Sequence, residues 1–246
     1  MSIKDKVIIV TGAASGIGQA TAELFATQDA TLILVDRDQV KLQELVLKLK
    51  RPTNKVTSYF LDVSHSNEVS QMVQACHAEF ERIDVLIHAA GICKPAPLLD
   101  MSDEQWHETL SINLNGAFFL TREVGKVMSA QKSGTMILMT SDRGLYGSAD
   151  YAHYAASKGG MIALVKSLAL YLGKYKVTVN GLNPGMTDTP LARGANPDKW
   201  DAKLALDVLG QATSPEEAAQ TLLYLSGSAS LYTTGQIIGT RLRYGQ

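Results

Sequence analysis

Three side chains that can move a proton lie close together in the sequence. Tyr154 and Lys158 are four residues apart, and Ser141 lies thirteen residues before Tyr154. Residues four apart on a helix are surface neighbours, so the phenol and the ammonium would share one face. A nearby cation favours the phenolate and lowers the pKa of a phenol from its ordinary value of about 10. Lys158 is therefore expected to bring the pKa of Tyr154 towards neutral pH.

Ser141 supplies a hydroxyl group that could hydrogen-bond the oxygen of a carbonyl or an alcohol while Tyr154 gives or takes its proton. If a hydride carrier binds beside them, Ser141, Tyr154 and Lys158 predict an enzyme that interconverts a carbonyl and an alcohol. A tyrosine four residues before a lysine is usually only a surface feature. The serine, together with a glycine-rich turn near the N-terminus, favours the catalytic interpretation.

The glycine-rich turn indicates where a hydride carrier would bind. The apolar run Val7–Val10 leads into a turn in which Gly12, Gly16 and Gly18 have the spacing Gly-x-x-x-Gly-x-Gly. A buried strand, a glycine-rich turn and a helix form the unit that binds dinucleotides, because backbone N–H groups at the helix N-terminus can contact the pyrophosphate. A glycine turn without a ligand is the alternative, and the residue after the next strand argues against it.

That residue, Asp36, also bears on the choice of cofactor. It follows the apolar run Thr31–Val35, where a carboxylate can accept hydrogen bonds from both hydroxyls of a ribose. The same carboxylate would repel the 2′-phosphate of NADP, and no basic residue replaces Ser15 in the turn. Arg37 is the complication, since a guanidinium there could bind a phosphate. We expect NAD, with NADP as the less favoured cofactor.

With both motifs in view, the chain resembles the short-chain dehydrogenase/reductase family over nearly all of its 246 residues. The resemblance implies that Asp62 and Val63 flank the adenine, that the segment 89–91 shapes the cofactor cleft, and that Thr189 contacts the carboxamide. It also implies that Lys158 holds the nicotinamide ribose and that Asn113 keeps a water linking Lys158 to solvent. The expected catalytic residues are Asn113, Ser141, Tyr154 and Lys158. The expected cofactor-binding residues are Gly12, Ser15, Gly16, Ile17, Gly18, Asp36, Arg37, Asp62, Val63, Ala89, Ala90, Gly91, Lys158, Pro184, Gly185, Thr187 and Thr189.

The sequence departs from the family pattern at two places. The usual Asn-Asn-Ala-Gly after the fourth strand begins with His88 and Ala89, which would change how the central strand is tied to its neighbours. The usual Asp-Gly-Gly near the C-terminus is replaced by Thr-Arg-Leu-Arg at 240–243, which bears on the last strand and on subunit contacts. Arg241 and Arg243 are expected to be solvated or interfacial.

Short β-rich runs alternate with segments of helical period, which predicts βαβ units and a parallel sheet. We expect one domain over residues 1–246: a Rossmann-type, doubly wound α/β fold with seven parallel strands and helices on both faces. A substrate lid is expected at about 186–209. The predicted strands are Val7–Val10, Thr31–Val35, Val56–Leu61, Val85–Ala89, Met136–Thr140, Val177–Gly181 and Gln236–Gly239. The predicted helices are Ile17–Gln28, Gln39–Lys50, Asn67–Glu81, Asp103–Gln131, Tyr151–Gly173 and Pro215–Ser226.

Composition excludes several other classes of protein. With 24 acidic and 23 basic residues the net charge is −1, so no basic field would hold nucleic acid or an anionic membrane. The apolar run after Lys6 is far too short for an export signal or a membrane span. Cys76 and Cys93 are too few for a disulfide framework, and no Cys/His cluster has the spacing of a metal site. We expect a cytoplasmic protein without a metal.

Three residues are candidates for the substrate pocket: Arg143, Tyr151 and Met186. Arg143 follows Ser141 by two residues and could share its side of the strand end. A guanidinium there could hold a carboxylate or phosphate with two parallel hydrogen bonds; the alternative is that it pairs with Asp142. Neighbouring His153 is expected at the surface, an interface or the substrate. The Cys93 thiol is expected to be inert, because the sequence places no cation beside it.

The sequence therefore predicts an NAD-dependent dehydrogenase that acts on a secondary alcohol or ketone, with a small-molecule substrate. An NADP-dependent reductase of 3-oxoacyl thioesters is the alternative within the enzymes. A non-catalytic NAD-binding regulator is the alternative from another class, and it would be expected to lack Ser141, Tyr154 or Lys158. Apolar residues on the two long helices, including Phe118, Phe119, Met161 and Leu164, predict a homotetramer, or otherwise a dimer.

Overall fold

Seven parallel strands form one sheet in the computed structural model, which describes residues 2–51, 54–195 and 197–241. The strand order is β3-β2-β1-β4-β5-β6-β7, so the chain runs from β1 to one edge, returns to β4, and continues to the other edge. This doubly wound, Rossmann-type sheet confirms the predicted fold. The strands are β1 (Val7–Thr11), β2 (Thr31–Asp36), β3 (Val56–Phe60), β4 (Val85–His88), β5 (Gly134–Met139), β6 (Val177–Asn183) and β7 (Ile237–Gly239).

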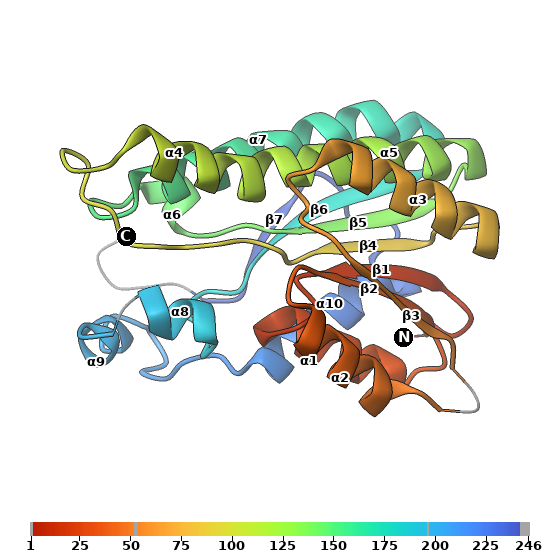
Figure 1. Ribbon diagram of the computed structural model, residues 1–246, viewed down its shortest axis with the longest axis horizontal. Helices are drawn as coiled ribbons and strands as arrows, with labels where there is room; N and C mark the ends of the chain where they lie inside the picture. The colour runs from red at the N-terminus through yellow and green to blue at the C-terminus, as the bar shows by residue number, and fades with distance from the viewer. Residues whose placement is uncertain (1, 52–53, 196, 242–246) are drawn as a thin grey trace.

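Helices cover both faces of the sheet, as Figure 1 shows. One face carries α1 (Gly16–Ala26), α2 (Gln39–Leu49) and α10 (Pro215–Ser226). The opposite face carries α3 (Ser66–Phe80), α5 (Gly116–Gln131) and α7 (Ala152–Leu172), with α4 (Asp103–Leu110) at one end. None of these helices, nor any other in the part of the chain that the structure describes, is long and apolar enough to cross a membrane.

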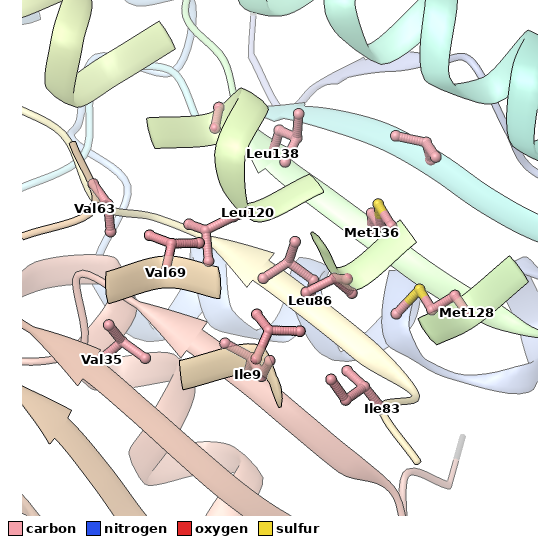
Figure 2. Close-up of a cluster of buried hydrophobic side chains, with 14 of the residues drawn as sticks. Ile9, Val35, Val63, Val69, Ile83, Leu86, Leu120, Met128, Met136 and Leu138 are labelled. Carbon is pink, nitrogen blue, oxygen red and sulfur yellow. The ribbon is translucent and has the colours of Figure 1, made fainter. Parts of the chain in front are cut away.

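The core consists of two apolar layers, one on each face of the sheet. Successive strand residues point to opposite faces: Ile9 joins the layer beneath α3, α5 and α7, whereas Ile8 and Val10 join the layer against α1, α2 and α10. Figure 2 shows Ile9 and Leu86 from the sheet packed against Leu120 of α5. Strands buried on both faces explain why their sequences are nearly continuous apolar runs.

The expected helix Asp103–Gln131 is interrupted. Between α4 and α5 the backbone forms one π-helical turn, Ser111–Asn115, which contains Asn113. Such turns occur mostly as single insertions in α-helices, often at functional sites. Three short helices were not predicted: α6 (Arg143–Tyr146), α8 (Pro190–Ala195) and α9 (Trp200–Leu204). They lie beyond the ends of β5 and β6, on the left in Figure 1.

Some apolar side chains on α5 and α7 are exposed, whereas others are buried in the core. Phe118 is 44% exposed, and Leu170 and Tyr171 near the end of α7 are also exposed. Met161 is fully buried in the core, so its predicted place on an exposed apolar surface is wrong. Its helical position faces the sheet rather than solvent.

Candidate active site

A cleft of about 320 Å³ opens at the carboxyl ends of the strands. This is the edge where open α/β sheets bind their ligands, because loops and helix N-termini converge there. Every residue expected to contact the cofactor lines this one cleft, although their positions range from 12 to 189 in the sequence. Among the described residues, the cleft is also lined by residues that were not predicted as site residues, including Ile92, Ile112, Met139 and Thr140, and by Pro190 and Leu191 from the predicted lid.

The glycine-rich turn forms the floor of the cleft because its backbone lies closer to neighbouring segments than a side chain would allow. Gly12 has a φ of +67°, and a Cβ there would lie 2.7 Å from the backbone nitrogen of Ala90. A Cβ on Gly18 would lie 2.1 Å from the carbonyl oxygen of Gly12, so α1 packs directly on the turn. Ser15 precedes α1 without a side-chain cap. The first N–H groups of α1 are thus suited to a phosphate.

Asp36 is held at the end of β2 by two backbone groups. One of its carboxylate oxygens accepts the N–H of Ala14 at 2.9 Å, and the other accepts the N–H of Asp38 at 2.9 Å. The carboxylate is thereby fixed beside the glycine turn, where a ribose would lie. Arg37 extends to Asp62 instead, with 3.5 Å between guanidinium nitrogen and carboxylate oxygen, and is half exposed.

The pKa of Asp62 reflects opposing influences. Burial raises the pKa of the carboxyl, but a hydrogen bond from the Ser64 N–H at 2.9 Å and the nearby Arg37 charge together hold it below its ordinary value. Asp62 is therefore an anion that can accept hydrogen bonds at the edge of the cleft.

Ser141, Tyr154 and Lys158 come together at the inner end of the cleft. Ser141 lies two residues beyond β5, and α7 carries the other two side chains. The short helix α6 fits against α7 because it contains Gly144, where a Cβ would lie 2.6 Å from the carbonyl carbon of Lys158. Ser141 and Tyr154 line the same two cavities, and the Ser141 hydroxyl donates to the carboxylate of Asp142 at 3.0 Å and accepts the N–H of Arg143 at 3.2 Å.

The ionisation of Tyr154 differs from the sequence prediction. Burial is the main influence and raises the pKa of the phenol, Cys93 raises it further, and the charge of Arg143 opposes the shift only in part. Lys158 lies 5.6 Å from the centre of the Tyr154 ring and donates to the carbonyl oxygen of Met139 at 2.6 Å. Burial also lowers the pKa of Lys158 to about 8. The pKa of Tyr154 is therefore raised, contrary to the prediction that Lys158 would bring it towards neutral pH.

Asn113 is fully buried in the π-helical turn and does not line the cleft. Its side-chain oxygen accepts the N–H of Ile92 at 2.8 Å, and its amide donates to the carbonyl of Ile92 at 2.9 Å and to Ser157 Oγ at 3.2 Å. The side chain thus fastens the segment after β4 to α7, one residue from Lys158.

His88 joins the two central strands β1 and β4. Its Nδ1 lies 2.9 Å from the hydroxyl of Thr11, which links the end of β4 to the end of β1 beneath the glycine turn. Burial lowers the pKa of this imidazole to about 3, and the nearby Lys158 charge acts in the same direction. His88 is therefore neutral and structural.

A second, smaller cavity adjoins the cleft and shares Ser141, Tyr154, Gly185 and Leu191 with it. Arg143 and Met186, two of the expected substrate residues, line this cavity. The remaining lining residues are Cys93, Asp142, Ala192, Ala195 and Lys203.

Tyr151 is buried behind Arg143 and lines neither cavity. The guanidinium carbon of Arg143 lies 3.9 Å from the centre of the Tyr151 ring, and the Tyr151 hydroxyl donates to the carbonyl of Ala195. Tyr151 therefore supports the cavity wall rather than forming it. His153, next to Tyr154, is also buried and lines neither cavity, so its expected position at the surface or the substrate is wrong.

Cys93 does have a cation beside it, contrary to the sequence prediction. An Arg143 side-chain nitrogen lies 3.1 Å from its sulfur. Burial nevertheless raises the pKa of the Cys93 thiol, and the charges of Arg143 and Lys158 offset this only in part. The thiol is expected to stay protonated, because desolvation is the larger influence.

The segment after β7 contacts the region beyond β6. Arg241 is largely buried and lies 3.5 Å from the buried carboxylate of Asp207, and it also donates to the carbonyl of Gln211. Its expected solvated position is therefore wrong. Leu242 and Arg243 lie outside the described residues.

Comparisons with known proteins agree with this geometry. A family model described as enoyl-(acyl carrier protein) reductase matches residues 12–240. The 3-oxoacyl-[acyl-carrier-protein] reductase of Thermotoga maritima is 37% identical over 239 residues, 97% of each chain. A cyclopentanol dehydrogenase of a Comamonas species is 32% identical over 235 residues, 95% of this chain and 94% of that one. The structure of NAD⁺-bound xylitol dehydrogenase superimposes with a TM-score of 0.91 at 25% identity, covering 98% of this chain and 99% of that one.

Proposed function

Because the chain belongs to the short-chain dehydrogenase/reductase family of oxidoreductases, which bind a nicotinamide cofactor, we propose that it is an NAD-dependent enzyme acting on a secondary alcohol or the corresponding ketone. One observation carries this proposal. Ser141 and Tyr154 lie at the junction of two cavities, the larger of which is lined by the glycine turn, Asp36 and Lys158. A substrate in the smaller cavity would meet the cofactor beside these two hydroxyl groups.

The residues of the larger cleft fit a nicotinamide dinucleotide. The N-terminus of α1 and the glycine turn would hold the pyrophosphate, Asp36 the adenosine ribose, and Asp62 and Val63 the adenine. Lys158 would hold the nicotinamide ribose, and Thr187 and Thr189 the carboxamide end. The bound nicotinamide would supply the hydride acceptor in oxidation and the hydride donor in reduction.

The chain's own residues would then handle the proton. Ser141 would hydrogen-bond the substrate oxygen and fix its orientation. Tyr154 would take the hydroxyl proton as an alcohol becomes a ketone, and would return it in the reverse direction. The pKa of Tyr154 is raised, so the phenol would be protonated at neutral pH and ready to donate to a ketone. Lys158, held by burial and by Met139, would supply the positive charge that stabilises the phenolate once it forms.

NAD is the proposed cofactor because of Asp36. Its carboxylate, fixed by two backbone N–H groups, would repel the negative charges of the 2′-phosphate of NADP. Arg37, which could offset them, is paired with Asp62 across 3.5 Å. We also propose that residues 186–195 and 197–209, which contain α8 and α9, close over the substrate as a lid within a single catalytic domain.

A second candidate is an NADP-dependent reductase of 3-oxoacyl thioesters, favoured by the 37% identity to the Thermotoga maritima reductase. The third, a non-catalytic cofactor-binding regulator, is disfavoured because Ser141, Tyr154 and Lys158 are all present and adjacent.

Absorbance at 340 nm distinguishes these candidates. Purified protein would be assayed with NADH and NADPH in parallel, against a panel of ketones and a 3-oxoacyl thioester. We expect a higher kcat/KM with NADH, and expect Asp36→Ala to narrow the gap between the cofactors. A kcat/KM at least as high with NADPH, greatest on the thioester, would favour the second candidate. Binding of cofactor without turnover of any compound would favour the regulator.

A further inference from the structure

The smaller cavity holds two cations beside the proposed reaction centre. Arg143 comes from α6, two residues after Ser141, and Lys203 comes from α9 in the proposed lid. Both line the cavity that includes Ser141 and Tyr154. Sixty residues separate them in the sequence, and the fold brings them to one wall.

Both cations lie against one aromatic ring. The Arg143 guanidinium carbon is 3.9 Å and the Lys203 ammonium nitrogen 5.5 Å from the centre of the Tyr151 ring. Such contacts stabilise a cation in a partly desolvated position. Tyr151 is itself fixed, since it is buried and its hydroxyl donates to Ala195. The ring therefore restricts where the two positive charges can lie.

The charge of the cavity favours an anion with a single negative charge. Asp142 also lines it, and its carboxylate accepts the Ser141 hydroxyl at 3.0 Å and the Arg143 N–H at 2.8 Å. Two cations against one carboxylate leave a net charge of +1 on this wall. A monoanionic carboxylate would balance that charge, whereas a phosphate dianion would exceed it. A guanidinium also matches the two oxygens of a carboxylate in a bidentate geometry.

We propose that Arg143 and Lys203 form an anion-binding subsite, and that the substrate is a hydroxy acid or oxo acid whose carboxylate binds there while its alcohol or ketone reaches Ser141 and Tyr154. The inference rests on the proposed function, which assigns the second cavity to the substrate. It deepens that function by naming the chemical class of the substrate. Lys203 lies on α9, so it would reach the carboxylate only when the proposed lid is closed, and binding of the anion would favour the closed lid.

The first test compares oxo acids with their methyl esters, which keep the ketone but remove the charge. The probes are 2-oxobutanoate, 4-oxopentanoate and 5-oxohexanoate, each beside its methyl ester, with NADH as cofactor. We expect at least one acid to exceed its ester in kcat/KM by about 10-fold or more, because hydrogen bonds to charged groups are worth about 1.5–3 kcal/mol. Equal values for every acid and its ester would overturn the subsite and leave the proposed oxidoreductase activity intact.

The second test uses variants. Arg143→Met and Lys203→Met should each raise KM for the preferred acid, the former by about 10- to 100-fold, with KM for the ester and affinity for NADH unchanged. Lys199→Met is the matched control: Lys199 immediately precedes α9, and its side chain is 69% exposed. Arg143→Lys should retain part of the preference for the acid over its ester, since it keeps the positive charge but loses the bidentate geometry of the guanidinium. If Arg143→Met does not fold, Arg143→Lys and Lys203→Met carry the test. An acid KM within twofold of wild type in the folded variants would refute the role.

Calorimetry separates this inference from the proposed function. Titration of 4-oxopentanoate and its methyl ester into the NAD⁺ complex, in which no hydride is available to reduce the ketone, measures binding without turnover. Preferential binding of the acid, lost in Lys203→Met and kept in Lys199→Met, would support the subsite even if no probe were reduced. Equal binding of both compounds would contradict it.

Discussion

Gly12→Ala is the most informative test of the cofactor cleft. The residue has a φ of +67°, and a Cβ would lie 2.7 Å from the Ala90 nitrogen and 2.8 Å from the Ala89 carbonyl carbon. These are backbone atoms, so they cannot move aside as a flexible side chain would. A left-handed conformation costs alanine roughly 1–2 kcal/mol, and overpacking adds about 1–3 kcal/mol. Alanine also lowers the conformational entropy of the unfolded chain, which offsets about 0.4–1 kcal/mol of this loss of stability.

Gly210→Ala is the matched control, because Gly210 has a φ of +64° and, among the described residues, no heavy atom within 4 Å of a built Cβ. Thermal unfolding should place Gly210→Ala roughly 2–4 °C below wild type and Gly12→Ala roughly 5–15 °C below it, given about 2–4 °C per kcal/mol for a chain of this size. Only Gly12→Ala should weaken NADH binding, measured by its fluorescence, by about 10-fold or more. Equal stability and equal NADH affinity in the two variants would refute the close approach of the turn to the end of β4.

Two further predictions concern charge and assembly. Burial lowers the pKa of Lys158 to about 8 from an ordinary value near 10.5, so between these pH values the unfolded chain binds more protons and the free energy of unfolding rises with pH. Urea unfolding should show that Lys158→Met loses this rise, on the order of 1 kcal/mol per pH unit, and parallel pH profiles of the two proteins would contradict it. Light scattering at micromolar concentration should give a homotetramer, with a dimer as the smaller alternative. The reason is that Phe118, Leu170 and Tyr171 expose apolar surface on α5 and α7. A particle of 26.5 kDa, the mass of a monomer, would contradict this prediction.

The fold could be predicted because its central strands β1, β2 and β4 are buried on both faces. Runs such as Val7–Val10 and Thr31–Val35 are apolar throughout, and the helices between them have a clear period. The π-helical turn at Asn113 could not be predicted in this way, since one inserted residue hardly changes the apolar pattern of a long helix. The helices α6, α8 and α9 are too short to show a period.

The site was predictable where its residues are close in sequence or follow strand ends. The glycine turn, Asp36 and the pair Tyr154 and Lys158 belong to this group. Lys203 does not, because it lies on a short helix that only the tertiary structure brings beside Arg143. The raised pKa of Tyr154 was missed for a related reason: burial is a property of the packed site, and spacing reveals only the nearby charge.

The central claim is that Tyr154 transfers the proton while the glycine turn, Asp36 and Lys158 hold the cofactor. Tyr154→Phe tests it most directly, since the change removes only the phenolic oxygen from a side chain whose ring stays in place. Steady-state turnover with NADH and the best ketone of the panel should be compared with NADH affinity in the same preparation. The account predicts that kcat falls roughly 100-fold or more while the Kd for NADH stays within a few-fold of wild type. A Tyr154→Phe protein that keeps a tenth of the wild-type kcat would contradict it.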